Sequence, residues 1–146
     1  MKKQALFTAG YEKRSVEEFF GLLRKNKVSV LLDVRYRAQS RRKGFSKSSL
    51  AKECQSLGIA YTHDRELGTP PEMMKAAQEN GGYDPQLFAK YRKFLSTKRE
   101  SLQKASELAA SSRTCLLCYE LDPMNCHRRV VAEFVAKKTG VSVTHI

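Results

Sequence analysis

The chain has 146 residues, of which 41% are hydrophobic, and a formal net charge of +12. This length suits a single domain with its own core, and this composition excludes a largely disordered chain. No run of residues is long and apolar enough for a conventional transmembrane helix, and the N-terminus lacks the apolar run of a signal peptide. We therefore expect a cytoplasmic protein that does not contact a membrane.

Strand-like and helical patterns alternate from the start of the chain. Ser15 and Glu18 form the sequence pattern of a capping box at the start of a helix. A nearly continuous apolar run at 28–34 is typical of a strand that is covered on both faces. In chain order, the first half predicts a strand at 5–10, a helix from 16, a strand at 28–34, a basic loop at 35–44, a helix at 47–57 and a strand at 59–63.

The second half continues the alternation. Glycines and prolines make 67–85 the least regular part, with a short helix expected at 72–79. In chain order, the remaining pattern predicts helical structure at 86–111, a buried strand at 114–119, a helix at 126–138 closed by Gly140, and a strand at 141–146. Strands separated by helices predict a single α/β domain with a mostly parallel sheet of about five strands and helices on both faces.

Ligands of open parallel sheets bind beyond the carboxyl ends of the strands, so the polar residues there are the first candidates. Asp33 and Arg35 end the second predicted strand, and alternation places them on one side. They form either a structural ion pair or a carboxylate and guanidinium in one cleft. Glu120 follows the fourth predicted strand, and Tyr11 follows the first.

The segment 118–129 carries the strongest local signal. It delivers Glu120 from a buried strand, turns at a proline, and begins the next helix with Cys126, His127 and Arg128. Free amides and the dipole at a helix start favour anions, and Arg128 is suited to clamp a phosphate. The alternative is that Asp122 or Asn125 caps the helix while Arg128 pairs with an acid.

The cysteines at 54, 115, 118 and 126 are too few for a small secreted disulfide scaffold, so we expect reduced thiols. Zinc is not expected, because residues three apart on a strand, such as Cys115 and Cys118, point to opposite faces. No other metal or cofactor is predicted. Cys126 beside a histidine and an arginine remains a candidate nucleophile, although an inert thiol is favoured.

The loop 35–47 is strongly basic, and aromatic residues lie within it. Cations interleaved with aromatic rings suit phosphates and stacked bases, whereas the alternative is a solvated surface loop. The candidate nucleic-acid-binding residues of this loop are Arg37, Arg42, Lys43 and Lys47.

Several motifs resemble, in order and over essentially the whole chain, the domain-of-unknown-function family numbered 488. They include 8–11, 33–35, 40–42, 44–46, 58–61, 66–70 and the segment 118–129. The resemblance implies a small α/β domain with its shared polar residues in one cleft, and it adds Ser40, Arg41 and Gly68 to the candidate substrate-binding residues. It implies no particular reaction, because the family has no assigned activity.

We therefore predict an enzyme acting on a nucleic acid or phosphate-bearing nucleotide, at an N-glycosidic or phosphate-linked centre. Asp33 or Glu120 would be the catalytic carboxylate, while Arg35, Arg128 and the helix start near Cys126 would hold phosphate. Tyr11 would stack on a base or donate a hydrogen bond. The alternatives are a non-catalytic nucleic-acid-binding protein and a cysteine-dependent enzyme using Cys126. The oligomeric state stays open.

Overall fold

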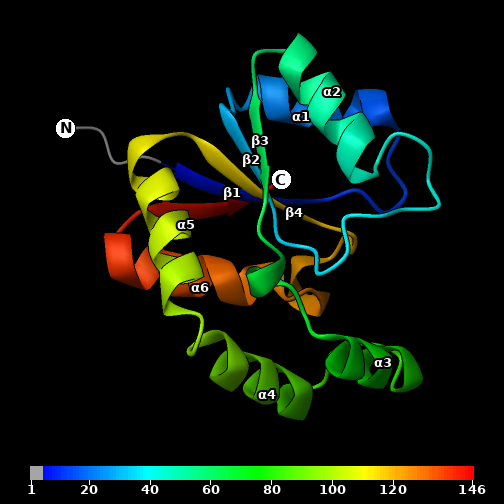
Figure 1. The fold of residues 1–146 in the computed structure, drawn as a ribbon, viewed down its shortest axis with the longest axis vertical. Helices are drawn as coiled ribbons and strands as arrows, with labels where there is room; N and C mark the ends of the chain where they lie inside the picture. Colours follow the sequence, from blue (N-terminus) through cyan, green and yellow to red (C-terminus); the bar gives the residue numbers. More distant parts are fainter. Residues whose placement is uncertain (1–4) are drawn as a thin grey trace.

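In the computed structural model, which describes residues 5–146, five parallel strands form one sheet in the order β3-β2-β4-β1-β5 (Figure 1). The strands are β1 (Ala5–Gly10), β2 (Val30–Asp33), β3 (Ala60–His63), β4 (Thr114–Cys118) and β5 (Ser142–His145). The helices are α1 (Val16–Lys25), α2 (Lys47–Ser56), α3 (Pro71–Glu79), α4 (Pro85–Leu95), α5 (Arg99–Ser111) and α6 (Arg128–Thr139), with short 3₁₀ helices η1 (Arg65–Leu67) and η2 (Pro123–Asn125). The predicted single α/β domain is confirmed, and the sheet is entirely parallel.

The helices cover both faces of the sheet, as the sequence predicts. Helices α1 and α2 lie on one face, while α5 and α6 lie on the other (Figure 1). The apolar side chains form two clusters accordingly: Phe19 and Leu50 belong to one, whereas Leu102 and Val130 belong to the other. The chain moves from β1 to β3 in one direction and returns through β4 to β5 in the other. Right-handed crossovers then require the helices of the two halves to lie on opposite faces.

This reversal of direction fixes where a ligand site belongs. Strand β4 lies between β2 and β1, and the helix after β4 leaves toward the opposite face from the helices after its two neighbours. Such a topological switch point opens a crevice beyond the carboxyl ends of the strands. The ends of β1, β2 and β4 therefore converge on one region.

Most predicted elements are present, but two helical predictions need correction. The helical stretch predicted at 86–111 is two helices, α4 and α5, because the apolar sets around Leu95 and Leu102 need a change of direction to reach the same core. The helix predicted from Cys126 begins at Arg128, after the separate turn η2. The Ser15–Glu18 capping box is confirmed, with both reciprocal hydrogen bonds at 3.0 Å. Within residues 5–146, no helix is long and apolar enough to cross a membrane.

Candidate active-site cleft

A cleft of about 850 Å³ opens beyond the carboxyl ends of β1, β2 and β4. Tyr11, Arg35 and Glu120, one from each strand end, all line it. One member of each polar cluster that the sequence predicts to meet, Arg35 at the end of β2 and Glu120 at the end of β4, therefore faces the same cleft. Gly10 makes this convergence possible, because a Cβ atom there would lie 1.8 Å from the carbonyl oxygen of Glu120.

The carboxylate at the end of β2 is fully engaged in hydrogen bonds within the protein. Asp33 is completely buried, and its carboxylate accepts hydrogen bonds from Arg35 Nε at 2.9 Å and from Arg35 Nη2 at 2.6 Å. The hydroxyl of Tyr61 donates to the same carboxylate at 2.6 Å. Asp33 does not line the cleft. The structure therefore supports the ion-pair alternative and gives no support to a direct catalytic role for Asp33.

Arg35 connects the residues that form one wall of the cleft. Besides its pair with Asp33, it donates from Nη1 to the Phe45 carbonyl at 2.7 Å and to the Tyr11 hydroxyl at 3.2 Å. Burial opposes the charged guanidinium, but the hydrogen bonds and charge of Asp33 leave the pKa of Arg35 above its ordinary value. The Tyr11 ring stacks on Phe45 with centroids 4.4 Å apart. This network fixes the wall on which a ligand would rest.

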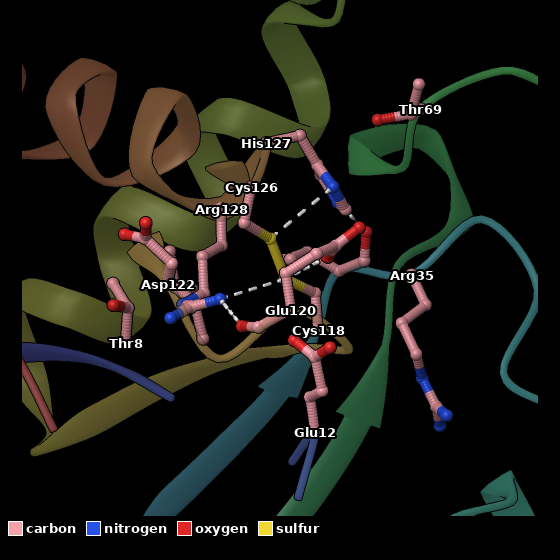
Figure 2. Close-up of a disulfide and its surroundings, with 12 residues drawn as sticks. Thr8, Glu12, Arg35, Thr69, Cys118, Glu120, Asp122, Cys126, His127 and Arg128 are labelled. Carbon is pink, nitrogen blue, oxygen red and sulfur yellow. Dashed lines mark hydrogen bonds between the residues drawn. A yellow bond between two sulfur atoms is a disulfide. The ribbon is translucent and has the colours of Figure 1, made fainter. Parts of the chain in front are cut away.

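The acid at the end of β4, Glu120, differs from Asp33 in the contacts of its carboxylate. Glu120 is half-buried, and among residues 5–146 no lysine or arginine forms an ion pair with it. Its Oε2 lies 3.5 Å from the Sγ of Cys118 (Figure 2). Burial raises the pKa of Glu120 above its ordinary value. An acid in this state is available to accept or donate a proton.

Arg128 holds the turn that carries Glu120. Its side chain is 1% exposed and does not line the cleft, which corrects the prediction that it clamps a substrate phosphate. The guanidinium donates to the Glu120 carbonyl at 2.5 Å and to the Leu121 carbonyl at 3.2 Å (Figure 2). Burial lowers the pKa of Arg128 to about 10. Arg128 thus positions the backbone of the site.

Two cysteines meet at the floor of the cleft. The sulfurs of Cys118 and Cys126 form a disulfide, so the prediction of reduced thiols is wrong for this pair, whereas Cys54 and Cys115 are free. Cys115 and Cys118 belong to the cores on opposite faces of the sheet, as the strand argument predicted. Cys126 is fully buried, and its bonded sulfur provides no thiolate for a nucleophilic role.

His127 lies against the disulfide and lines the cleft. Its Nε2 lies 2.7 Å from the Val34 carbonyl oxygen, and the Tyr91 ring meets the imidazole edge to face at 5.5 Å. Burial lowers the pKa of His127 to about 4. Because a carbonyl oxygen can only accept a hydrogen bond, Nε2 carries the proton of the neutral ring, and Nδ1 carries none.

The basic loop divides into two groups. The residues of this loop that line the cleft are Arg37, Ser40, Arg41 and Arg42. Lys43 and Lys47, which were also predicted to bind nucleic acid, lie outside it. Arg42 is anchored by a 2.7 Å hydrogen bond to the Tyr11 carbonyl. The guanidinium groups of Arg37 and Arg41 belong to exposed residues and remain available to an anion.

The far wall of the cleft comes from the irregular segment 67–85, which is rich in glycine and proline. Tyr83 follows α3, its hydroxyl lies 2.9 Å from Thr69 Oγ1, and its backbone donates to Asn125 Oδ1 at 3.0 Å. The glycine pair before Tyr83 was the available signal, because Gly82 has φ +143 and faces Asn125 closely. Gly68 does not line the cleft. A Cβ there would lie 2.3 Å from the Tyr36 nitrogen, so Gly68 serves packing instead.

Comparisons with known proteins give one match. The family model described as "Domain of unknown function DUF488" matches residues 15–135, which is most of the chain. No curated protein and no solved structure matches the chain.

Proposed function

Because the chain belongs to the DUF488 family, whose description names no activity, we propose a function from the cleft itself. The protein is an enzyme that acts on a phosphate-bearing substrate, a nucleotide or a nucleic acid. Glu120 is its catalytic carboxylate. A cytoplasmic location, as expected from the sequence, is part of this proposal, since nucleotides and nucleic acids are abundant there.

The observation that carries the proposal is the carboxylate of Glu120, which pairs with no cation among residues 5–146 and lies in a cleft with an arginine-rich rim. A half-buried acid without a cation repels phosphate at close range, so a protein that only binds phosphate gains nothing from it. An enzyme does gain, because such a group serves as general acid or base, or faces a cationic transition state. The rim supplies the compensating attraction for the substrate.

The remaining residues have distinct roles under this proposal. Arg37 and Arg41 bind substrate phosphate at the rim. Tyr119, which is 45% exposed at the cleft, offers a ring on which a base stacks. Asp33 and Arg128 are positioning residues, since they act through Arg35 and through the Glu120 backbone. A base in duplex DNA would have to leave the stack to reach this cleft.

The second candidate function is non-catalytic nucleic-acid binding, which the exposed arginines of the basic loop and the net charge of +12 favour. It differs from the enzyme in one respect: neutralising Glu120 would leave all measurable function intact or strengthen binding. The cysteine-dependent enzyme has less support, because Cys126 is buried and bonded to Cys118.

The test is the Glu120→Gln variant, assayed on a panel of nucleotides and short DNA and RNA strands with products identified by mass spectrometry. We expect turnover to fall roughly 100-fold or more, as for loss of a general acid or base. Substrate affinity should change little, because the rim arginines remain. Glu100→Gln, a neutralised acid that is 87% exposed on α5, is the matched control and should be fully active.

Unchanged turnover in Glu120→Gln would remove Glu120 from the mechanism. Tight binding across the panel with no product from the unmodified protein would favour the binding function instead.

A further inference from the structure

Three buried side chains of types that bind metal ions lie close together beside the cleft. Cys118, Cys126 and His127 each place one donor atom within 4.8 Å of the others, and all three are buried. They come from the end of β4 and from the residues just before α6, so the turn between them brings the three together. Cys118 and His127 line the cleft, and the group therefore faces the space where a substrate would bind (Figure 2).

The imidazole of His127 is held as a metal-binding histidine is held. Its Nε2–H donates to the Val34 carbonyl, and this leaves Nδ1 free on the side of the sulfurs. Metal-ligating histidines almost always donate their other N–H to a carbonyl or carboxylate, which fixes the ring and its tautomer. The edge contact with Tyr91 holds the ring in the same orientation.

The separations fit a tetrahedral ion once the sulfurs are reduced. His127 Nδ1 lies 3.9 Å from Cys126 Sγ. Ligands of one zinc ion, with bonds of about 2.0 Å to nitrogen and 2.3 Å to sulfur, lie roughly 3.6 Å apart. The Cα atoms of Cys118 and Cys126 are 7.5 Å apart, beyond the usual range of about 4.4–6.8 Å for directly bonded cysteines. At this Cα separation, rotation of the two side chains after reduction can move the sulfurs apart, so that one ion fits between them.

We propose that the reduced protein binds one zinc-class divalent cation through the thiolates of Cys118 and Cys126 and through Nδ1 of His127. The fourth position faces the cleft, beside the Glu120 carboxylate. Three protein ligands with an open position are typical of catalytic rather than structural zinc sites. The inference goes beyond the proposed function and does not depend on it, because it concerns binding of the ion alone.

Metal binding first requires reduction of the disulfide between Cys118 and Cys126. A dithiol reductant transfers two electrons and two protons to the Cys118–Cys126 disulfide, giving two thiols and the oxidised dithiol. The divalent cation then displaces both thiol protons, which pass to solvent, so that two thiolates offset its charge. Arg128 Nη1, 3.3 Å from the Cys118 sulfur, favours the thiolate there.

The experiment titrates the reduced, metal-free full chain with Co²⁺ under anaerobic conditions and then displaces Co²⁺ with Zn²⁺. We expect one equivalent of Co²⁺ per chain, with thiolate-to-cobalt charge-transfer absorption and the visible bands of a tetrahedral site. The disulfide form should bind neither ion. Absence of charge-transfer absorption in the reduced, folded protein would overturn the proposal, whatever the variants do.

Variants identify the ligands. Cys126→Ser and His127→Gln should weaken Co²⁺ binding by roughly 100-fold or more, since even the loss of outer-sphere contacts costs 10–100-fold. Cys115→Ser is the matched control, because Cys115 lies on β4 but belongs to the opposite core, and it should bind like the unmodified chain. Undiminished binding in folded Cys126→Ser would contradict the site.

Glu120→Gln separates this inference from the proposed function. It should keep the Co²⁺ site while losing turnover. Unchanged turnover with the Co²⁺ site intact would refute the proposed function alone. Absence of Co²⁺ binding by the reduced unmodified chain, with turnover still lost in Glu120→Gln, would refute the metal site alone.

Discussion

Two strand ends of this sheet carry an acid followed by an arginine, and they differ in what the arginine holds. At the end of β2, Arg35 binds the carboxylate of Asp33 directly, and Tyr61 completes the pair. At the end of β4, Arg128 binds the backbone carbonyl of Glu120 and leaves its carboxylate alone. One acid is therefore part of the scaffold, whereas the carboxylate of the other has no ion-pair partner among residues 5–146.

The contacts of the two acids distinguish them, whereas their positions at strand ends do not. Asp33 is the last residue of one buried strand, Glu120 lies two residues after another, and an arginine contacts each of them. Asp33 is saturated because Arg35 is two residues away and points to the same side. Arg128 reaches Glu120 from the next helix, where the turn presents carbonyl groups to it instead.

The largest expected effect separates the two acids by stability. Asp33→Asn should lower the free energy of unfolding by about 3–5 kcal/mol, because it leaves the buried guanidinium of Arg35 without its counter-charge. Glu120→Gln, the same exchange of a carboxylate for an amide, should change it by less than about 1 kcal/mol, because no ion pair is lost. Urea unfolding of both variants measures the contrast. Equal losses of unfolding free energy in the two variants would mean that Asp33 and Glu120 do not differ in their contribution to stability.

A smaller loss of stability is expected when the ion pair of Asp33 and Arg35 loses the hydroxyl of Tyr61. Tyr61→Phe should cost about 1.5–3 kcal/mol, the range for a hydrogen bond to a charged group, since its hydroxyl donates to Asp33. Tyr36→Phe is the control, because its hydroxyl accepts a hydrogen bond from Arg65 at the exposed surface, and it should change the free energy of unfolding by no more than about 0.5 kcal/mol. Thermal and urea unfolding should agree on this order. If Tyr61→Phe left the free energy of unfolding unchanged, the ion pair of Asp33 and Arg35 would not depend on the Tyr61 hydroxyl.

The smallest expected effect concerns the rim of the cleft. Arg41→Ala should lower the salt dependence of oligonucleotide binding by about one phosphate contact, a change of roughly 0.7–0.9 in the slope of log K against log salt. Lys47→Ala removes the same charge outside the cleft and should leave the slope unchanged. Fluorescence anisotropy over a salt series provides both slopes. A greater effect of Lys47 would move the binding surface away from the cleft.

The sequence predicts the parallel sheet, the Ser15 capping box and the meeting of Tyr11, Arg35 and Glu120, because strand ends of a parallel sheet share one edge. It does not predict what Arg128 binds, since that depends on how the turn before α6 folds. The far wall at Tyr83 was also missed, because its contacts with Thr69 and Asn125 join segments far apart in the chain. Local patterns carry no information on such pairs.

The most direct test of the distinction between the two acids is carboxyl footprinting of the native protein. The chain is treated with a water-soluble carbodiimide and an amine, and labelled sites are mapped by mass spectrometry. Labelling of Glu120 in the folded protein, with Asp33 labelled only after unfolding, is the predicted result. Labelling of Asp33 at the rate of Glu120, or protection of both acids, would contradict the account.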